Sequence, residues 1–230
     1  MKTASRFSWM VALLTVLNIA SARAAETKKA AAPKPDADGW YTIFNGKDFD
    51  GWKKSNDNQD AFNVVDGEIV VRGKVCHLFY DGPVKDANFK NFEWKADVLT
   101  KPNSNSGMYF HTKWQDKGFP QTGIECQVNN SHRDQIRTGS LYRLQDIVKK
   151  SEDSPAKDDE WFTQTIIVNG NHITVKLNDK VVNDYTWPDG LKRKDGFEKN
   201  LLGSGTFALQ GHDPGSEVHY KNIKVKPLPQ

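Results

Sequence analysis

Short segments of alternating apolar and polar residues, separated by turns rich in Gly, Asn and Asp, run through most of this chain. Residues 62–65 and 68–71 show the pattern most plainly, because the Asp66-Gly67 pair between them is a favoured two-residue hairpin turn. Such alternation places successive side chains on opposite faces of a strand. The sequence therefore predicts an all-β, single-domain fold of about a dozen short strands, arranged as an antiparallel jelly-roll sandwich of two sheets.

Further strands are expected wherever the same alternation recurs between turn residues. These segments are residues 89–100, 107–114, 123–130, 138–144, 162–168, 172–177, 180–185, 205–212 and 217–226. Two charged or Gly-rich stretches, residues 145–159 and 187–204, are expected to be loops at the rim of the sandwich.

The amino-terminal part of the chain predicts export. Residues 1–24 have the three parts of a secretory signal peptide, with Lys2 and Arg6 in the basic region before an apolar run. That run is shorter than the ~20 residues that cross a bilayer, so we expect no membrane span and a periplasmic or secreted protein. Residues 25–38 have the composition of a disordered leader, and residues 39–230 suit one domain.

The net charge argues against a nucleic-acid partner, and the two cysteines raise the question of a disulfide. The formal charge is +3, but three positive charges, Lys2, Arg6 and Arg23, belong to the signal, so the exported chain is neutral overall. No basic stripe remains that would predict a nucleic-acid partner. Cys76 and Cys126 can form a disulfide in an oxidising compartment or stay free and buried, and the sequence leaves both alternatives open.

The predicted strand at residues 123–130 carries unusual polar side chains. On one face lie the apolar residues Ile124, Cys126 and Val128. On the other face lie one carboxylate and two carboxamides, Glu125, Gln127 and Asn129. Carboxylates and amides hydrogen-bond sugar hydroxyls, whereas a solvated strand face more often carries Thr, Lys, Ser and Arg. This strand therefore favours a ligand site.

Three other predicted strands repeat the pattern of one apolar and one polar face. Their polar positions are Tyr109 and His111, Ser140 and Tyr142, and Gln210 and His212. If these strands share a sheet, its polar face is typical of a saccharide site, where aromatic rings stack on sugars and amides hold hydroxyls. Each residue alone also fits ordinary packing or solvent exposure, so the joint pattern carries the prediction.

The polar set fits conventional glycosidase chemistry poorly. Such enzymes use two carboxyl groups that flank the scissile bond, whereas the position two residues after Glu125 is the amide Gln127. A divalent cation is an alternative if His111, His212 and Glu125 converge, because imidazole and carboxylate are common ligands. Their spacing in the sequence does not decide this.

Several motifs, in order along the chain, resemble the 3-keto-disaccharide hydrolase family, also described as the 3-keto-glucoside 1,2-lyase/3-keto-2-hydroxy-glucal hydratase domain. Residues 43–52 (IFNGKDFDGW) are similar to the "LFNGKDLDGW" start of that family. Further matching motifs lie at residues 62–67, 105–110, 123–128, 138–142, 160–161, 177–178 and 209–212. The departures are His111 in place of Arg, Asn129 or Asn130 in place of Asp, and Phe162 in place of Asn.

This resemblance, which covers residues 39–228, implies a concanavalin A-like jelly roll that cleaves 3-keto-glycosides by β-elimination and hydration. The keto-sugar would come from a sugar 3-dehydrogenase. Either Glu125 or His212 is then the base, and the other is the acid or a metal ligand. The remaining polar residues would orient the sugar or polarise its ketone: Tyr109, His111, Gln127, Asn129, Tyr142 and Gln210. The alternatives are a non-catalytic carbohydrate-binding module and, less favoured, a conventional endo-glycanase.

Overall fold

The computed structural model describes residues 31–148 and 154–229. The predicted signal peptide and the first part of the predicted leader lie outside the described residues. The last part of that leader is tied to the domain, because the Asp36 carboxylate accepts a hydrogen bond of 2.9 Å from the Trp40 amide and lies 3.3 Å from Lys224 Nζ.

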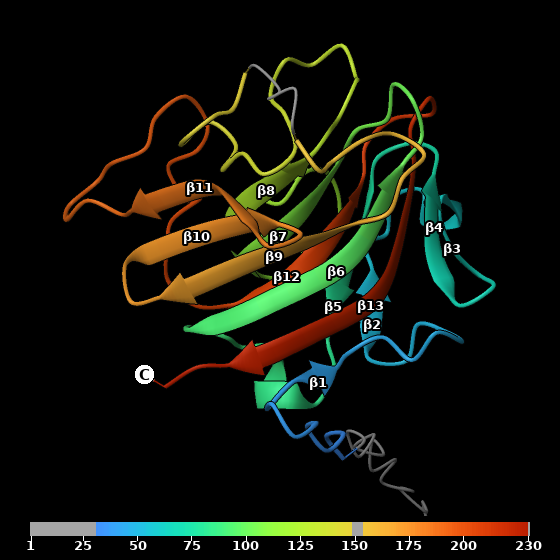
Figure 1. Cartoon of the computed structure of the whole chain (residues 1–230), viewed down its shortest axis with the longest axis horizontal. Helices are drawn as coiled ribbons and strands as arrows, with labels where there is room; N and C mark the ends of the chain where they lie inside the picture. Colours follow the sequence, from blue (N-terminus) through green and yellow to red (C-terminus); the bar gives the residue numbers. More distant parts are fainter. Residues whose placement is uncertain (1–30, 149–153, 230) are drawn as a thin grey trace, which may run out of the picture.

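Two antiparallel sheets form a sandwich (Figure 1). In spatial order the larger sheet contains β11 (Lys180–Thr186), β10 (His172–Leu177), β9 (Phe162–Asn169), β6 (Phe92–Thr100), β13 (Glu217–Pro227), β4 (Glu68–Arg72) and β3 (Phe62–Val65), with β1 (Tyr41–Thr42) paired to β13. The smaller sheet contains β2 (Trp52–Lys54), β5 (Cys76–Tyr80), β12 (Thr206–Gly211), β7 (Ser106–Thr112) and β8 (Ile124–Val128). Two short 3-10 helices span Gln59–Ala61 and Val84–Ala87. The predicted jelly-roll sandwich is confirmed.

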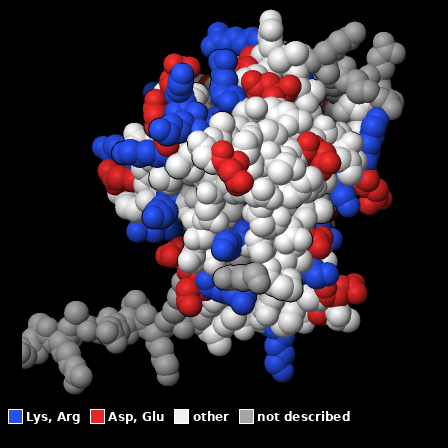
Figure 2. Space-filling view, turned by 90° about the vertical axis from the view of Figure 1, so that its left-hand side faces the viewer, with Lys and Arg blue, Asp and Glu red and all other residues white. Residues whose placement is uncertain are grey.

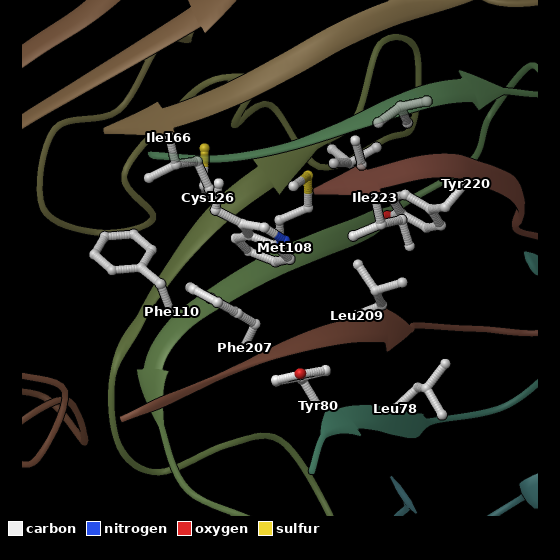
Figure 3. Packing of buried hydrophobic residues seen from close by; sticks show 14 of the residues in the cluster. Leu78, Tyr80, Met108, Phe110, Cys126, Ile166, Phe207, Leu209, Tyr220 and Ile223 are labelled. Atoms are coloured by element: carbon white, nitrogen blue, oxygen red, sulfur yellow. The ribbon is translucent and has the colours of Figure 1, made fainter. Parts of the chain in front are cut away.

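The hydrophobic core fills the space between the two sheets, and Figure 3 shows its side chains from β7, β8, β9, β12 and β13. Trp94 of β6 stacks on Phe207 of β12, with 4.4 Å between the ring centroids. Phe207 also stacks on Phe89 at 4.5 Å. Truncating a buried aromatic residue of this kind to Ala typically costs about 3–5 kcal/mol of unfolding free energy. This packing therefore fixes the smaller sheet against the larger one.

One predicted strand is absent, and one buried strand was not predicted. Residues 138–144 form no regular strand, and Leu141 makes only isolated bridges to Cys126 and Gln145. The backbone φ of +88° at Gly139 and of 55° at Arg143 interrupts extended pairing there. The alternation rule also missed β5, whose five residues are all buried, because a strand covered on both faces shows no apolar–polar period.

The two cysteines lie on strands that do not neighbour each other, since β12 and β7 separate β5 from β8. Both thiols are free and buried. Of the two alternatives that the sequence leaves open, the structure therefore shows the free, buried cysteines.

Charged side chains of both signs are interspersed over the face in Figure 2, with uncharged areas between them. Among the described residues, no helix has the length and apolarity that a membrane crossing requires.

Candidate active site

A pocket of about 440 Å³ lies on the face of the smaller sheet that points away from the core. Its floor follows from strand alternation: Met108 and Cys126 point into the core, so Tyr109 and Glu125 point the other way. The lining residues are Asn105, Tyr109, Phe119, Pro120, Gln121, Gly123, Glu125, Gln127, Asp134, Tyr142, Arg193, Asp195, Gly196, Phe197, Asn200, Gln210 and His212. Six of the eight predicted site residues are therefore brought together: Tyr109, Glu125, Gln127, Tyr142, Gln210 and His212.

Glu125 is held by hydrogen bonds at both carboxylate oxygens. Tyr109 Oη donates to Oε2 over 2.8 Å, and Gln210 Nε2 donates to Oε1 over 2.9 Å. The Gln127 amide, in the orientation that satisfies both of its polar atoms, donates to Ser106 O and to Glu125 Oε1 at 3.0 and 3.2 Å. Three neighbours on three strands therefore fix this carboxyl group in the pocket floor.

Burial raises the pKa of Glu125 to about 7, because the bonds from Tyr109 and Gln210 offset the loss of hydration only in part. A carboxyl group with this pKa exchanges protons readily near neutral pH, as general acid–base catalysis requires. Space for its side chain comes from Gly107 on β7, where an added Cβ would collide with Glu125 Oε1. Glycine at this position therefore leaves room for the carboxyl group of Glu125 where the structure places it.

His212 follows directly after β12 and lies beside Asp213 at the pocket. Its Nδ1 is 2.8 Å from Asp213 Oδ2. Its Nε2 is 3.4 Å from Nδ2 in the side chain of Asn105, a buried pocket residue that was not predicted as a site residue from the sequence. The second site group is therefore an imidazole whose two nitrogens have different neighbours.

Asp213 accepts further hydrogen bonds that hold it in place. Ser216 Oγ donates to Oδ2 over 2.7 Å, and the Gly215 amide donates to Oδ1 over 2.9 Å. Burial raises the pKa of Asp213, but the bonds from Ser216 and His212 outweigh that effect and leave the pKa below its ordinary value. Asp213 is thus an ionised carboxylate at neutral pH.

His132 completes this cluster. Its Nε2 lies 3.6 Å from Asp213 Oδ2, and its Nδ1 accepts a hydrogen bond of 3.1 Å from the Asp134 amide. His132, His212 and Asp213 offer three ligand atoms within 4.8 Å of one another, so their positions suit a metal ion. This set differs from the predicted one, since it includes neither His111 nor Glu125.

His111 does not lie at the pocket, so its predicted place on the polar face is wrong. Its φ of 56° interrupts the alternation of β7, and its ring packs against Phe92 of the opposite sheet with 5.5 Å between centroids. Nε2 lies 2.9 Å from Lys90 O, and Nδ1 accepts from the Gly203 amide over 3.1 Å. His111 therefore joins three segments of the chain.

Asn129 is also absent from the pocket lining. Its Nδ2 donates to Asp134 O and Ile136 O over 2.9 and 2.8 Å, and its Oδ1 accepts from the His132 amide over 2.9 Å. A fully buried side chain that makes these bonds organises the loop after β8. Asn129 therefore lies outside the pocket that the other predicted residues line, and its bonds hold the backbone at His132 and Asp134.

Loops supply pocket residues that strand periodicity could not find. Asp134 is one, and Tyr142 Oη lies 3.5 Å from its Oδ2. A second carboxylate therefore does line the pocket, contrary to the expectation drawn from Gln127.

The loop of residues 187–204 closes another side of the pocket. Arg193 donates to Asn200 O over 3.0 Å and to Tyr142 O over 3.1 Å, and its guanidinium packs on Phe197 at 4.8 Å. Phe119, 47% exposed, also lines the pocket and lies near His212, with 5.8 Å between ring centroids. Aromatic rings thus face the pocket from two loops, as is common in saccharide sites.

The jelly-roll fold, with a pocket of amides, aromatic rings and a carboxyl group of near-neutral pKa, is typical of carbohydrate-active proteins. The sequence matches the 3-keto-alpha-glucoside-1,2-lyase-like domain over residues 39–226, and the chain belongs to this family. It is also 28% identical to a 3-keto-disaccharide hydrolase of Bacteroides thetaiotaomicron over 251 aligned positions, which cover 90% of this chain and 84% of the relative.

Solved structures support the fold. A provisionally assigned glycosyl hydrolase from Parabacteroides distasonis superimposes with a TM-score of 0.68 at 24% identity, covering 84% of this chain and 95% of that one. The carbohydrate-binding module CBM66 from Bacillus subtilis superimposes with a TM-score of 0.51 at 13% identity, covering 76% and 95%. The same sandwich therefore occurs in a protein assigned as a hydrolase and in a binding module, so the pocket chemistry has to separate the two functions.

Proposed function

We propose that this chain is an exported enzyme that cleaves the glycosidic bond of 3-keto-disaccharides or other 3-keto-glycosides by β-elimination followed by hydration. The observation that carries the proposal is Glu125, a carboxyl group with a pKa of about 7 that faces the same pocket as His212. A site that only binds sugar has no need of a proton donor and acceptor tuned to neutral pH. The family and the Bacteroides relative support the choice of a keto-sugar substrate.

The reaction begins with proton removal from C2, which the ketone at C3 has made acidic. The C2–H electrons form an enolate, whose collapse makes the C1–C2 double bond and breaks the bond from C1 to the glycosidic oxygen. That oxygen leaves with a proton from the enzyme. Water then adds its hydroxyl at C1 and a proton returns to C2, so the net reaction is hydrolysis. One base and one acid suffice, and no oxidant is consumed because the substrate arrives already oxidised.

Glu125 and His212 are the proton-transfer pair in this proposal. Gln127, Gln210 and Tyr109 hold Glu125 in place and offer amide and hydroxyl groups to the sugar. Tyr142 lines the wall beside them. Gln210 Oε1 and Asn105 Oδ1 are buried acceptors without a protein partner, which suits donation from sugar hydroxyls.

The substrate chemistry places a second enzyme before this one. A sugar with a ketone at C3 has to be formed by a sugar 3-dehydrogenase or another oxidoreductase that acts at that carbon. The predicted signal peptide supports a location in the periplasm or outside the cell, so we expect keto-sugars to be available there.

Asp134 supports a second candidate, a conventional glycoside hydrolase in which Glu125 and Asp134 flank the bond. The two functions differ in the substrate they require. Purified protein is incubated with 3-keto-trehalose or 3-keto-lactose and with the same sugars unoxidised. We expect turnover of the keto-sugars alone. Cleavage of an unoxidised sugar would support the conventional mechanism, and glycan binding without any turnover would indicate a binding module.

Two variants make the experiment specific to the pocket. Glu125→Gln should lose turnover by at least about 100-fold, a typical share for acid–base catalysis, and retain sugar binding. Glu160→Gln is the matched control, because Glu160 is 62% exposed on the surface and pairs only loosely with Lys157 at 3.9 Å. Full activity in both variants would show that Glu125 does not transfer the proton.

A further inference from the structure

We propose that Asp213 is a positioning residue that makes His212 the base of the reaction, with Glu125 as the acid. This inference rests on the proposed function and decides a point that the pocket lining alone leaves open, namely which of the two groups removes the C2 proton. It also brings in a residue outside the predicted site.

The hydrogen bonds of Asp213 determine which nitrogen of His212 carries the proton. Oδ2 is an acceptor 2.8 Å from His212 Nδ1, so Nδ1 carries the proton and donates it. In a neutral imidazole the other nitrogen, Nε2, then has the lone pair. Nε2 is also the nitrogen near the Asn105 amide, at 3.4 Å, on the side of the pocket. Asn105 Nδ2 can only donate, so this contact also places the lone pair on Nε2, and a bound sugar that displaces the long hydrogen bond can give its proton there.

The neighbours of Asp213 support the same assignment. The Asp134 amide donates to His132 Nδ1 over 3.1 Å, so His132 Nδ1 has the lone pair and its proton lies on Nε2, facing Asp213. Ser216 Oγ donates to the same carboxylate oxygen. Asp213 Oδ2 therefore accepts hydrogen bonds from the side chains of His212 and Ser216, and His132 Nε2 lies 3.6 Å away. Such a carboxylate also stabilises the imidazolium that forms when His212 takes a proton.

In the elimination step, this arrangement makes one pocket group the proton acceptor and the other the proton donor. Neutral His212, with its lone pair on Nε2, takes the C2 proton, and protonated Glu125 gives its proton to the leaving oxygen. Two titratable groups with different surroundings divide acid and base roles in this way in many enzymes. During hydration the transfers reverse: the N–H of the His212 imidazolium exchanges with solvent when the leaving group departs, His212 then delivers a solvent-derived proton to C2, and Glu125 takes one from water.

A metal ion bound to the same three residues would require a different proton arrangement. A metal at His132 Nε2 needs the lone pair on that nitrogen and a proton on Nδ1. The proton on Nδ1 would then point at the Asp134 amide hydrogen, which now donates to it. The observed hydrogen bonds thus favour the metal-free network, and the test below includes the metal as an outcome.

The test uses Asp213→Asn, because the Gly215 backbone N–H determines the orientation of the new carboxamide group. That N–H donates to Oδ1 over 2.9 Å, so the Asn oxygen stays there and its NH₂ replaces Oδ2. An NH₂ group facing His212 Nδ1 can only donate, and the imidazole proton moves to Nε2. The variant is therefore expected to invert the tautomer of His212 and to remove its lone pair from the pocket.

Two measurements follow this change. Long-range ¹H–¹⁵N NMR of the full protein without substrate reports the tautomer of each of the six histidines, and His212→Gln identifies the His212 signals. We expect the Nδ1–H tautomer in the wild type and Nε2–H in Asp213→Asn. With keto-disaccharide, kcat of Asp213→Asn should fall by at least about 100-fold and KM should stay within about twofold, because Asp213 does not line the pocket. Asp213→Glu, which keeps the carboxylate, should recover part of kcat.

The matched control is Asp184→Asn. Asp184 Oδ1 lies 2.7 Å from His172 Nε2 in an exposed His–Asp pair on β10 and β11, away from the pocket. Its turnover should equal that of the wild type. An Nε2–H tautomer in the wild type, or an unchanged kcat in Asp213→Asn, would overturn the proposal even if keto-sugar turnover is confirmed. One tightly bound equivalent of Zn²⁺ or Mn²⁺ that Asp213→Asn loses, together with turnover that EDTA abolishes, would overturn it too. A wild type without turnover refutes the proposed function and this assignment alike, whereas the NMR result still decides the tautomer.

Discussion

Replacing Glu125 by Gln removes a charge that burial penalises, and the pKa of that group sets the size of the effect on stability. The pKa is about 7 in the folded chain, against 4.5 for an ordinary glutamate. Between these values the unfolded chain has lost the proton and the folded chain still holds it. The unfolding free energy of the wild type therefore falls as the pH rises, by up to about 1.4 kcal/mol per pH unit.

Over the interval from 4.5 to about 7 the accumulated loss is roughly 3 kcal/mol, and it is complete above the folded-state pKa. Gln has no such titration, and its oxygen and NH₂ group can still pair with Gln210 and with the hydroxyl of Tyr109, which rotates. The stability of Glu125→Gln relative to the wild type should therefore increase by roughly 3 kcal/mol between about pH 4.5 and pH 8.

Urea unfolding at a series of pH values measures this difference directly. The contributions of distant titrating groups are the same in both proteins and cancel. The change with pH of the difference between the two unfolding free energies therefore reports on Glu125 alone. Glu160→Gln is measured alongside as the control, because it makes the same substitution at a carboxyl group that is exposed to solvent and lies outside the pocket lining. A difference between wild type and Glu125→Gln that stays constant across this range would refute the claim that burial raises the pKa of Glu125.

Three further predictions concern the same pocket and the cysteines. Tyr109→Phe removes a hydrogen-bond donor to Glu125 Oε2, so the pKa of Glu125 should rise further. The alkaline pH at which turnover is lost should then be higher than in the wild type. An unchanged pH–rate profile would contradict this prediction. Gly107→Ala places a Cβ against Glu125 Oε1, so we expect at least about tenfold lower kcat in a protein that still folds, and full activity would show that this carboxylate position is not required. A reducing agent should leave Tm unchanged, because Cys76 and Cys126 are free; a Tm lowered by several degrees would reveal a disulfide.

Strand periodicity correctly predicted which side chains form the floor of the pocket. In β7, β8 and β12 the side chains that alternate with Met108, Cys126 and Leu209 do point away from the core, which brings Glu125 and Gln210 together. The same rule failed at His111, where a left-handed backbone conformation interrupts the strand. Glycine usually signals a left-handed backbone conformation in a sequence, but this position is occupied by His. Nothing in the sequence therefore indicates that the strand is interrupted there.

The walls of the pocket could not be predicted from periodicity. Asp134 and Arg193 lie on loops whose course is fixed by tertiary hydrogen bonds, such as those from Asn129 to the 134–136 backbone and from Arg193 to Tyr142 O. Asp213 was missed for a related reason. Its importance comes from its bond to His212 and from the turn at Gly215, which are visible only once the chain is folded.

The central claim, that the glycosidic bond breaks after loss of the C2 proton, is tested most directly by turnover in D₂O. Purified wild-type protein cleaves a 3-keto-disaccharide in D₂O, and mass spectrometry of the product follows hydrogen at C2 at early times. Authentic product in the same buffer without enzyme measures spontaneous exchange. Elimination and hydration predict one deuterium at C2 in every product molecule formed. Product that keeps its original hydrogen at C2 would contradict the proposed mechanism and indicate direct substitution at C1.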